Sequence, residues 1–329
     1  MFNKFSNRRE FLRYGWLSIL LFLNSCSNSS KSVSLALQKS FYPESFKETI
    51  PNFWEQKKVN FGNVDLEKNK NIILNSDFTL FNDGWINNLN FDEFAEIKKL
   101  TLYENLDNRS IKFLNTFETN KKNKMFPVGV IPYAIIIKNN REIIKEATES
   151  WDFLLSKKLT KKIILPESPR IIISIAEKIQ SSNSLAKLKS QAMVFDDQNS
   201  LNWLINSDAC IAIVPFSLCS KYLKMDSRLS IVFPNQGVPL MWHFILSKLY
   251  SNNEILVRWI NSLKNSSTVN NLSSQGWYLP FKNSLLKSNK KLMKTKYFGP
   301  SNKCWDNSWS FPLLTNEQKI KFERFWKQS

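Results

Sequence analysis

Hydrophobic and polar positions alternate in short blocks along this chain, and the clearest blocks lie within residues 150–176. Trp151 and Leu154 recur at helical spacing behind Ser150, whose side chain can accept a hydrogen bond from the first helical turn. This pattern predicts a short helix that begins after Ser150. The apolar, β-branched run at residues 163–165 follows and predicts a short buried strand.

The turn after this strand has the chemistry of a ligand-binding loop. Pro166 ends the strand because proline cannot extend a central sheet ladder, and Ser168 followed by Pro169 predicts the start of a second helix. A strand end that leads into a helix N-terminus exposes N–H groups and the positive end of the helix dipole. Glu167, Ser168 and Arg170 are therefore candidate ligand-binding residues.

Similar blocks predict further elements on both sides of this segment. We expect strands at residues 33–37, 72–74, 134–138, 192–195 and 208–214, and helices at residues 44–54, 252–263 and 315–326. Ser76 and Asp77 follow the run at 72–74, so they are either ligand contacts at a strand end or helix caps. At 329 residues the chain is long enough for two domains.

The first 25 residues form a separate block that indicates export. Residues 7–13 resemble a twin-arginine signal, and the apolar run behind them is far shorter than the ~20 residues of a membrane-spanning helix. Residues 23–26 are similar to a lipobox. We therefore expect a signal peptide at 1–25, lipidation of Cys26 and a polar tether at 26–31. A plain N-terminal membrane anchor is the alternative.

The net charge of +18 changes this picture little. The first 25 residues contain four basic residues and one acidic residue, so the remaining chain keeps a net charge of +15. Its lysines are scattered among Asn and Ser and form no basic stripe with interleaved aromatics, which argues against nucleic-acid binding. A solvated basic surface near anionic lipid is the expected consequence.

Glycine and histidine usage excludes several classes of chemistry. The seven glycines are too far apart for a phosphate-binding loop, which argues against nucleotide binding. His243 is the one histidine and lies in an apolar stretch, so we expect a structural residue and no His-rich metal site. An exported enzyme that pairs His243 with Cys219 or a serine is the less favoured alternative, because no orienting partner is visible. The chain is expected to be no enzyme and to hold no cofactor.

Three cysteines remain after Cys26. Cys210 and Cys219 are expected either to pair, with Cys304 left over, or to remain reduced together with it, because spacing does not fix connectivity.

Several of these segments together resemble the polyamine-binding proteins of bacterial ABC importers. In that family a Ser-Trp-Asp helix, a strand and an Asp-Asp-x-Arg-Glu turn follow one another, and the turn at 167–171 here is Glu-Ser-Pro-Arg-Ile. Residues 126–133 resemble the family's Val-Pro-Tyr segment, and residues 276–280 resemble its Gly-Tyr-x-x-Pro turn. The segments occur in the family's order over about residues 32–329.

This resemblance implies a two-lobed α/β fold of the periplasmic-binding-protein type II class, with a central ligand cleft and two hinge crossings. Lobe 1 would comprise residues 32–134 and 245–329, and lobe 2 residues 135–244. It also implies a monomeric lipoprotein in the periplasm that captures a small polyamine-like solute and delivers it to an ABC permease. Neither nucleic acid nor a metal is expected, and iron is disfavoured because ferric binders of this shape typically use a tyrosine pair, whereas no two tyrosines are adjacent here.

This chain lacks the acidic residues that the family carries at its ligand-binding positions. The ligand-binding residues expected from the chain and the resemblance are Lys39, Ser76, Asp77, Tyr133, Glu167, Ser168, Arg170, Phe216 and Trp242. The family's acidic positions correspond to Ser40, Ser168, Ile171 and Trp242.

Nearby acids are expected to compensate for this loss. Glu167, Asp77 and one of the adjacent pair Asp196 and Asp197 are candidate replacements, since neighbouring side chains of an extended chain point opposite ways. The alternatives are a neutral or anionic solute held by Lys39, Arg170 and the helix N-terminus, or an envelope structural protein with a vestigial cleft.

Overall fold

The computed structural model describes residues 32–38, 42–60, 66–97, 102–139, 142–286 and 299–328. The expected signal peptide at 1–25, the lipidation site Cys26, the tether and the candidate ligand residue Lys39 lie outside these residues. Within the described ranges, no helix combines the length and the apolar character needed to cross a membrane.

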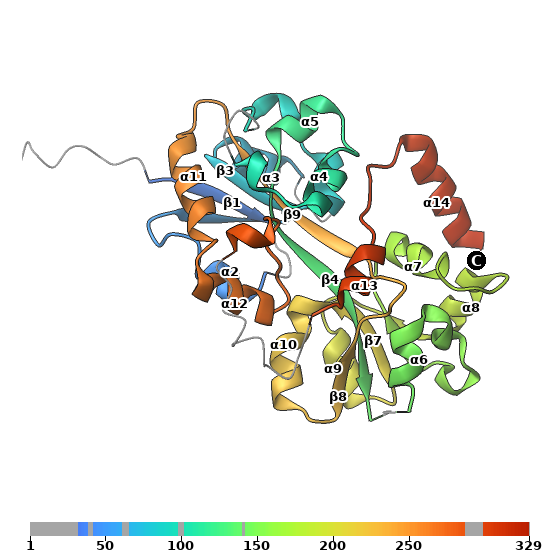
Figure 1. The fold of residues 1–329 in the computed structure, drawn as a ribbon. Helices are drawn as coiled ribbons and strands as arrows, with labels where there is room; N and C mark the ends of the chain where they lie inside the picture. The colour runs from blue at the N-terminus through green and yellow to red at the C-terminus, as the bar shows by residue number, and fades with distance from the viewer. Residues whose placement is uncertain are drawn as a thin grey trace, which may run out of the picture.

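The fold is organised around β4 (Phe126–Lys138), a thirteen-residue strand that is buried along almost its whole length. Its first half pairs antiparallel with β9 (Leu240–Ser247), and from Tyr133 onward it pairs antiparallel with β7 (Ile211–Pro215). Figure 1 shows β4 running from one side of the molecule to the other. Residues 126–133, which resemble the family's Val-Pro-Tyr segment, are thus part of the strand, which was expected only from residue 134.

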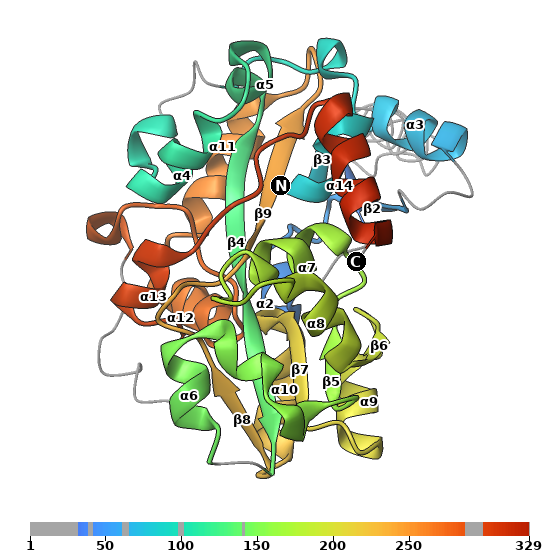
Figure 2. The ribbon, with the colours of Figure 1, turned by 90° about the vertical axis from the view of Figure 1, so that its right-hand side faces the viewer.

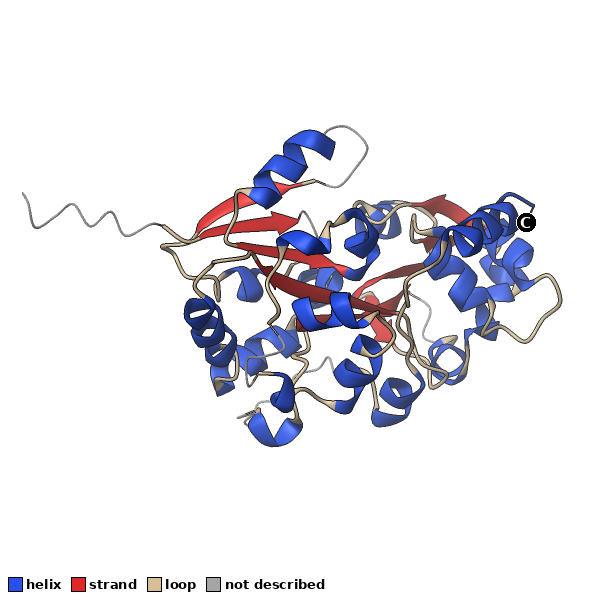
Figure 3. Ribbon diagram, turned by 90° about the horizontal axis from the view of Figure 1, so that it is seen from above, coloured by secondary structure: helices blue, strands red, loops and turns tan. Residues whose placement is uncertain are grey.

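The other described strands extend the sheet from the two halves of β4 in the order β2-β1-β3-β9-β4-β7-β5-β6, with β8 also beside β4. On the first side lie β1 (Ser34–Gln38), β2 (Glu55–Val59) and β3 (Phe78–Asn82). On the second lie β5 (Ile163–Leu165), β6 (Ala192–Phe195) and β8 (Leu229–Val232). We call these two sides the first lobe and the second lobe. Figure 3 shows helices on both faces of the twisted strands.

Helices cover each lobe separately. The first lobe carries α2 (Glu44–Lys47), α3 (Leu66–Leu74), α4 (Asn108–Leu114), α5 (Thr119–Lys124), α11 (Asn253–Ser262) and α12 (Ser266–Ser274). The second carries α6 (Ile144–Glu149), α7 (Pro169–Ala176), α8 (Ser184–Gln191), α9 (Ser200–Asn206) and α10 (Phe216–Met225). The predicted two-lobed α/β fold is confirmed. The exact lobe boundaries remain a prediction, although all of β9 pairs within the first lobe.

Local sequence signals predicted some elements correctly and others not. The strand at 163–165 and the helix that starts at Pro169 are present as β5 and α7, and Ser150 caps a short 3₁₀ helix at Trp151–Leu155. The expected strand at 72–74 is instead the end of α3, and the strand follows it as β3. A run of three apolar residues fits a helix end as well as a strand, and the tertiary packing decides between them.

The C-terminal segment crosses from the first lobe to the second. After α13 (Asn302–Asn307), Trp309 forms a bridge with Pro239, and its carbonyl oxygen accepts a hydrogen bond from Leu240 N at 2.9 Å. The chain then continues to α14 (Asn316–Gln328), which packs against α7 of the second lobe, as Figure 2 shows. This helix begins with a capping box, in which Thr315 and Gln318 exchange hydrogen bonds of 2.9 and 3.2 Å.

Gly129 of β4 provides a test of how tightly this strand is packed. A Cβ atom at Gly129 would lie 2.0 Å from the buried indole of Trp277, whose Nε1 donates to Val128 O. We expect Gly129→Ala to lower the free energy of unfolding by about 3 kcal/mol because neither the strand nor the indole has room to shift. Gly84→Ala is the control, since its Cβ would meet only the Asn82 side chain, at 3.2 Å. Chemical denaturation measures both, and equal stability of the two variants would contradict this packing.

Candidate functional site

A cavity of about 630 Å³ lies between the two lobes, within the size range of small-molecule sites. It is lined by Gln38, Asn60, Asn82, Asp83, Gly84, Trp85, Leu240 and Met241 from the first lobe, by Tyr133, Glu167, Ser168, Arg170, Ile171, Asp197 and Gln198 from β4 and the second lobe, and by Phe311 of the C-terminal segment. Polar groups and aromatic rings from distant parts of the chain therefore converge on one space.

The structure brings some of the sequence-predicted residues to this cavity. Tyr133, Glu167, Ser168 and Arg170 line it. The remaining described candidates do not line it; these are Ser76, Asp77, Phe216 and Trp242. Each of these four has contacts that explain its position.

Ser76 and Asp77 connect α3 to β3 at the end of β3 that lies away from the cavity. Ser76 is buried and its Oγ donates to Ile72 O at 2.7 Å. Asp77 Oδ2 accepts hydrogen bonds from Ser34 N and Ser34 Oγ, both at 2.8 Å, and so fastens the start of β1. They precede the strand because the expected strand at 72–74 is a helix.

Phe216 and Trp242 belong to the core. Phe216 packs edge-on against Phe233 with a centroid distance of 5.4 Å. Trp242 stacks on Phe113 at 5.2 Å, and its Nε1 donates to Ser310 Oγ at 2.7 Å. Since neighbouring strand residues point to opposite faces, it is Met241 that reaches the cavity.

Asp83, which the sequence analysis passed over, follows the true C-terminus of β3. Its side chain lines the cavity, and its buried Oδ2 has no hydrogen-bond partner in the described part of the chain. Burial raises the pKa of this carboxyl from 3.8 to about 7, although the positive charge of Arg170 acts in the opposite direction. The sequence Phe-Thr-Leu-Phe at 78–81, which has high strand propensity, followed by Asn-Asp-Gly was the signal that would have identified it.

The adjacent acids Asp196 and Asp197 take different roles. Asp196 accepts hydrogen bonds from the backbone N of Gln198 and Asn199 at 2.8 and 2.7 Å, so it stabilises the turn before α9. Asp197 faces the cavity, where its buried Oδ1 has no partner among the described residues. Burial, and then the nearby charge of Glu167, raise the Asp197 pKa from 3.8 to about 6.

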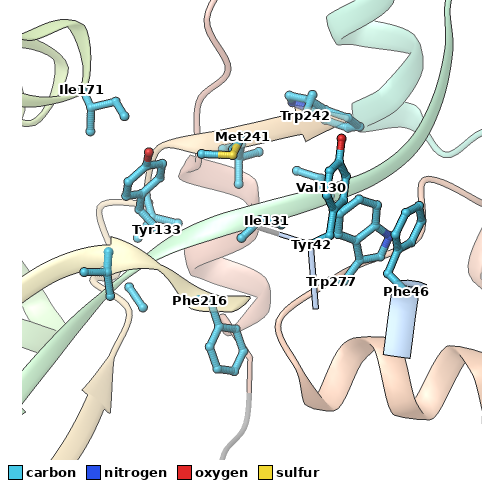
Figure 4. Packing of buried hydrophobic residues seen from close by; sticks show 14 of the residues in the cluster. Tyr42, Phe46, Val130, Ile131, Tyr133, Ile171, Phe216, Met241, Trp242 and Trp277 are labelled. Carbon is cyan, nitrogen blue, oxygen red and sulfur yellow. The ribbon is translucent and has the colours of Figure 1, made fainter. Parts of the chain in front are cut away.

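Tyr133 of β4 lines the same cavity as Asp83 and Asp197. It is the residue of β4 at which pairing with β9 gives way to pairing with β7. Burial raises the pKa of its hydroxyl, and the charges of Asp197 and Asp83 raise it further. Figure 4 shows the ring with its hydroxyl on the side where Ile171 and Met241 lie.

Arg170, in the first turn of α7, is the one basic side chain among the described lining residues. Its guanidinium lies over the Phe311 ring, 4.9 Å from the centroid, and one of its N–H groups donates to Pro312 O. Ser168, expected to cap α7, makes no side-chain capping hydrogen bond there. Arg170 therefore bonds to the C-terminal segment and not to a carboxylate of the cavity.

The groups around the cavity are of the types that stabilise a positive charge. Asp83, Glu167 and Asp197 outnumber the single guanidinium, and the rings of Trp85, Tyr133 and Phe311 are nearby. Carboxylates and aromatic faces are the groups that compensate the desolvation of an ammonium ion. The described residues contain no cluster of three or more His, Cys, Asp or Glu that could hold a metal ion.

The raised pKa of Asp83 has a consequence for stability. Its pKa of about 7 in the folded chain exceeds the ordinary value of 3.8. The charged carboxylate therefore lowers the free energy of unfolding; this loss is absent below about pH 4 and complete above about pH 7. Without solute, Asp83→Asn is expected to raise the free energy of unfolding at pH 8 by about 1–2 kcal/mol and to leave it nearly unchanged at pH 4.

Asp77→Asn is the matched control for this substitution. It is expected to lower stability by about 1 kcal/mol because it weakens the acceptor for Ser34. Thermal and urea unfolding of both variants measure the effect. A destabilising Asp83→Asn at pH 8 would contradict the assignment of Asp83 as a buried carboxyl group whose charged form lowers stability.

Comparison with known proteins places the fold. No family model matches the chain, and no curated protein matches it. Among solved structures, the chain is similar to a spermidine/putrescine ABC transporter substrate-binding protein of Streptococcus pneumoniae, with a TM-score of 0.63 and 14% identity over 90% of this chain and 97% of that one. A ferric binding protein of Campylobacter jejuni gives a TM-score of 0.61 and 10% identity, with 90% and 98% covered. An ABC transporter protein of Rhodopseudomonas palustris gives 0.60 and 15%, with 91% and 100% covered. The chain thus has the two-lobed fold found in these binding proteins.

Proposed function

We propose that this protein is a solute-binding protein of an ABC importer and that it holds a small cationic amine between its lobes. One observation carries the proposal. Asp83 from the first lobe and Asp197 from the second line the same cavity. Each has one buried carboxylate oxygen that has no hydrogen-bond partner among the described residues. Two such acceptors on opposite lobes fit a solute with amino groups at its two ends.

The energetics of these acceptors support an amine. Desolvating a carboxylate costs several kcal/mol unless it is paired, and the raised pKa values of Asp83 and Asp197 reflect that cost. An ammonium group that donates hydrogen bonds to a carboxylate would offset the cost for both partners. The polyamine-binding proteins that this chain resembles provide carboxylates at other positions, so the amine site here is rebuilt from Asp83, Glu167 and Asp197.

The anionic alternative has less support. Of its two candidate cations, Lys39 lies outside the described residues, and Arg170 already donates to Pro312 O and lies over the Phe311 ring. Three carboxylates beside the same cavity would repel an anion. Because a ferric binding protein shares the fold, ferric ion belongs in the test as a competitor.

In this proposal the protein captures its solute and performs no chemistry. The solute enters between the lobes, β4 and β9 bend near Tyr133 and Met241, and closure excludes water around the amine. The closed protein then docks on its permease. The proposal includes a periplasmic monomer held at the membrane by a lipid on Cys26.

Titration calorimetry of the protein without its first 25 residues tests the ligand class. We expect heat with 1,4-diaminobutane or spermidine and none with ferric citrate or a panel of anionic metabolites. Asp83→Asn and Asp197→Asn are each expected to weaken amine binding tenfold or more, which is about 1.4 kcal/mol or more. Asp196→Asn is the matched control, since Asp196 binds the turn before α9, and it should keep the wild-type affinity. Heat with the anions alone would overturn the amine proposal.

The pH dependence of binding gives a second test. An ammonium group binds the charged carboxylate, and the pKa values of Asp197 and Asp83 are about 6 and about 7, so amine affinity should rise from pH 5.5 to 8 and then level off. Binding at pH 6.5 should also release protons, detectable in buffers of different ionisation enthalpy. Asp83→Asn should remove the part of the rise near pH 7. A flat profile in the wild-type protein would refute the role of these acids.

A further inference from the structure

The C-terminal segment is fastened to the body of the protein by a row of cation–π contacts. Arg109 of α4 lies over Trp305, and three cations of the second lobe lie over the aromatic residues that follow. The distances to the ring centroids are 4.2 Å for Arg109 and Trp305, 4.9 Å for Lys178 and Trp309, 4.9 Å for Arg170 and Phe311, and 4.3 Å for Lys189 and Trp326. This segment therefore holds basic side chains from both lobes in fixed places.

Among these four cations, only Arg170 belongs to the cavity lining, together with its ring partner Phe311. Its hydrogen bond to Pro312 O leaves the guanidinium fixed at two points of the C-terminal segment. Arg170 and Asp83 line the same cavity, and the charge of each opposes the shift that burial causes in the pKa of the other. A positive charge is thus already present where a cationic solute would bind.

We propose that Arg170, held by Phe311 and Pro312, is the resident cation of this site and sets how many positive charges a solute may carry. The inference rests on the proposed function and deepens it. Three carboxylates and one guanidinium among the described lining residues leave two negative charges to be balanced. A linear diamine with two ammonium groups matches that balance, whereas a triamine brings a third charge that Arg170 repels.

The mechanism assigns different tasks to the two side chains. Arg170 acts on the solute through its charge, and Phe311 is a positioning residue that keeps the guanidinium at the cavity wall. Cation–π attraction depends on the ring face, so leucine at position 311 removes one of the two points that fix the guanidinium and keeps an apolar wall. The C-terminal segment, which no signal in the chain had connected with binding, then contributes to selectivity.

Calorimetry with 1,4-diaminobutane and spermidine at pH 7.5 tests this assignment. The wild-type protein should bind the diamine more tightly than the triamine. Arg170→Gln should shift the ratio of the two affinities at least tenfold toward spermidine, and it should do so less strongly in 0.5 M salt than in 0.05 M salt. Arg170→Lys keeps the charge and should keep most of the diamine preference. Phe311→Leu should reduce that preference at unchanged thermal stability.

Different results would overturn the role of Arg170 and the proposed function. If Arg170→Gln weakens both amines by the same factor while its melting temperature equals that of the wild type, Arg170 is a solute contact and the inference fails. If that variant does not fold, an unchanged affinity ratio in Phe311→Leu overturns the inference. A wild-type protein that binds neither amine refutes the proposed function itself, whereas amine binding with a ratio insensitive to position 170 refutes the resident cation alone.

Discussion

The hydrogen-bond register of β4 is the constraint on which the rest of the structure depends. One buried strand pairs with β9 up to Pro132 and with β7 from Tyr133 on, so a single backbone segment sets the relative position of both lobes. Because side chains alternate along a strand, this register also decides that Tyr133 faces the cavity. A side chain at position 129, where Trp277 leaves no room, would disturb the core and the cavity together.

Sequence reasoning succeeded where the signals were local and failed where they depended on register. Pro166 and the Ser168–Pro169 pair mark the boundary of β5 and α7 without help from distant residues, and both elements were predicted. Asp83 was missed because a helix was taken for the strand before it. The sequence also could not show whether Met241 or Trp242 faces the cavity, because a register shift of one residue moves every side chain of a strand to the other face.

The cavity and the surface of this protein have opposite electrostatic character. The chain as a whole carries a net charge of +18, yet carboxylates outnumber the one basic residue among the described lining residues of the cavity. The net charge of the chain therefore does not indicate the charge character of the cavity. The buried carboxylates of Asp83 and Asp197 cost stability while no cation is bound, which is the usual compromise between stability and binding. In the proposed function, a bound amine compensates that cost.

The central claim is that carboxylates of the two lobes grip the two ends of one amine. A crystal structure of the protein with 1,4-diaminobutane at pH 8 tests it most directly. The account predicts one ammonium group within hydrogen-bonding distance of Asp83 and the other at Asp197 or Glu167, with Arg170 still against Phe311. A diamine bound outside this cavity, or a cleft that holds none at saturating concentration, would contradict it.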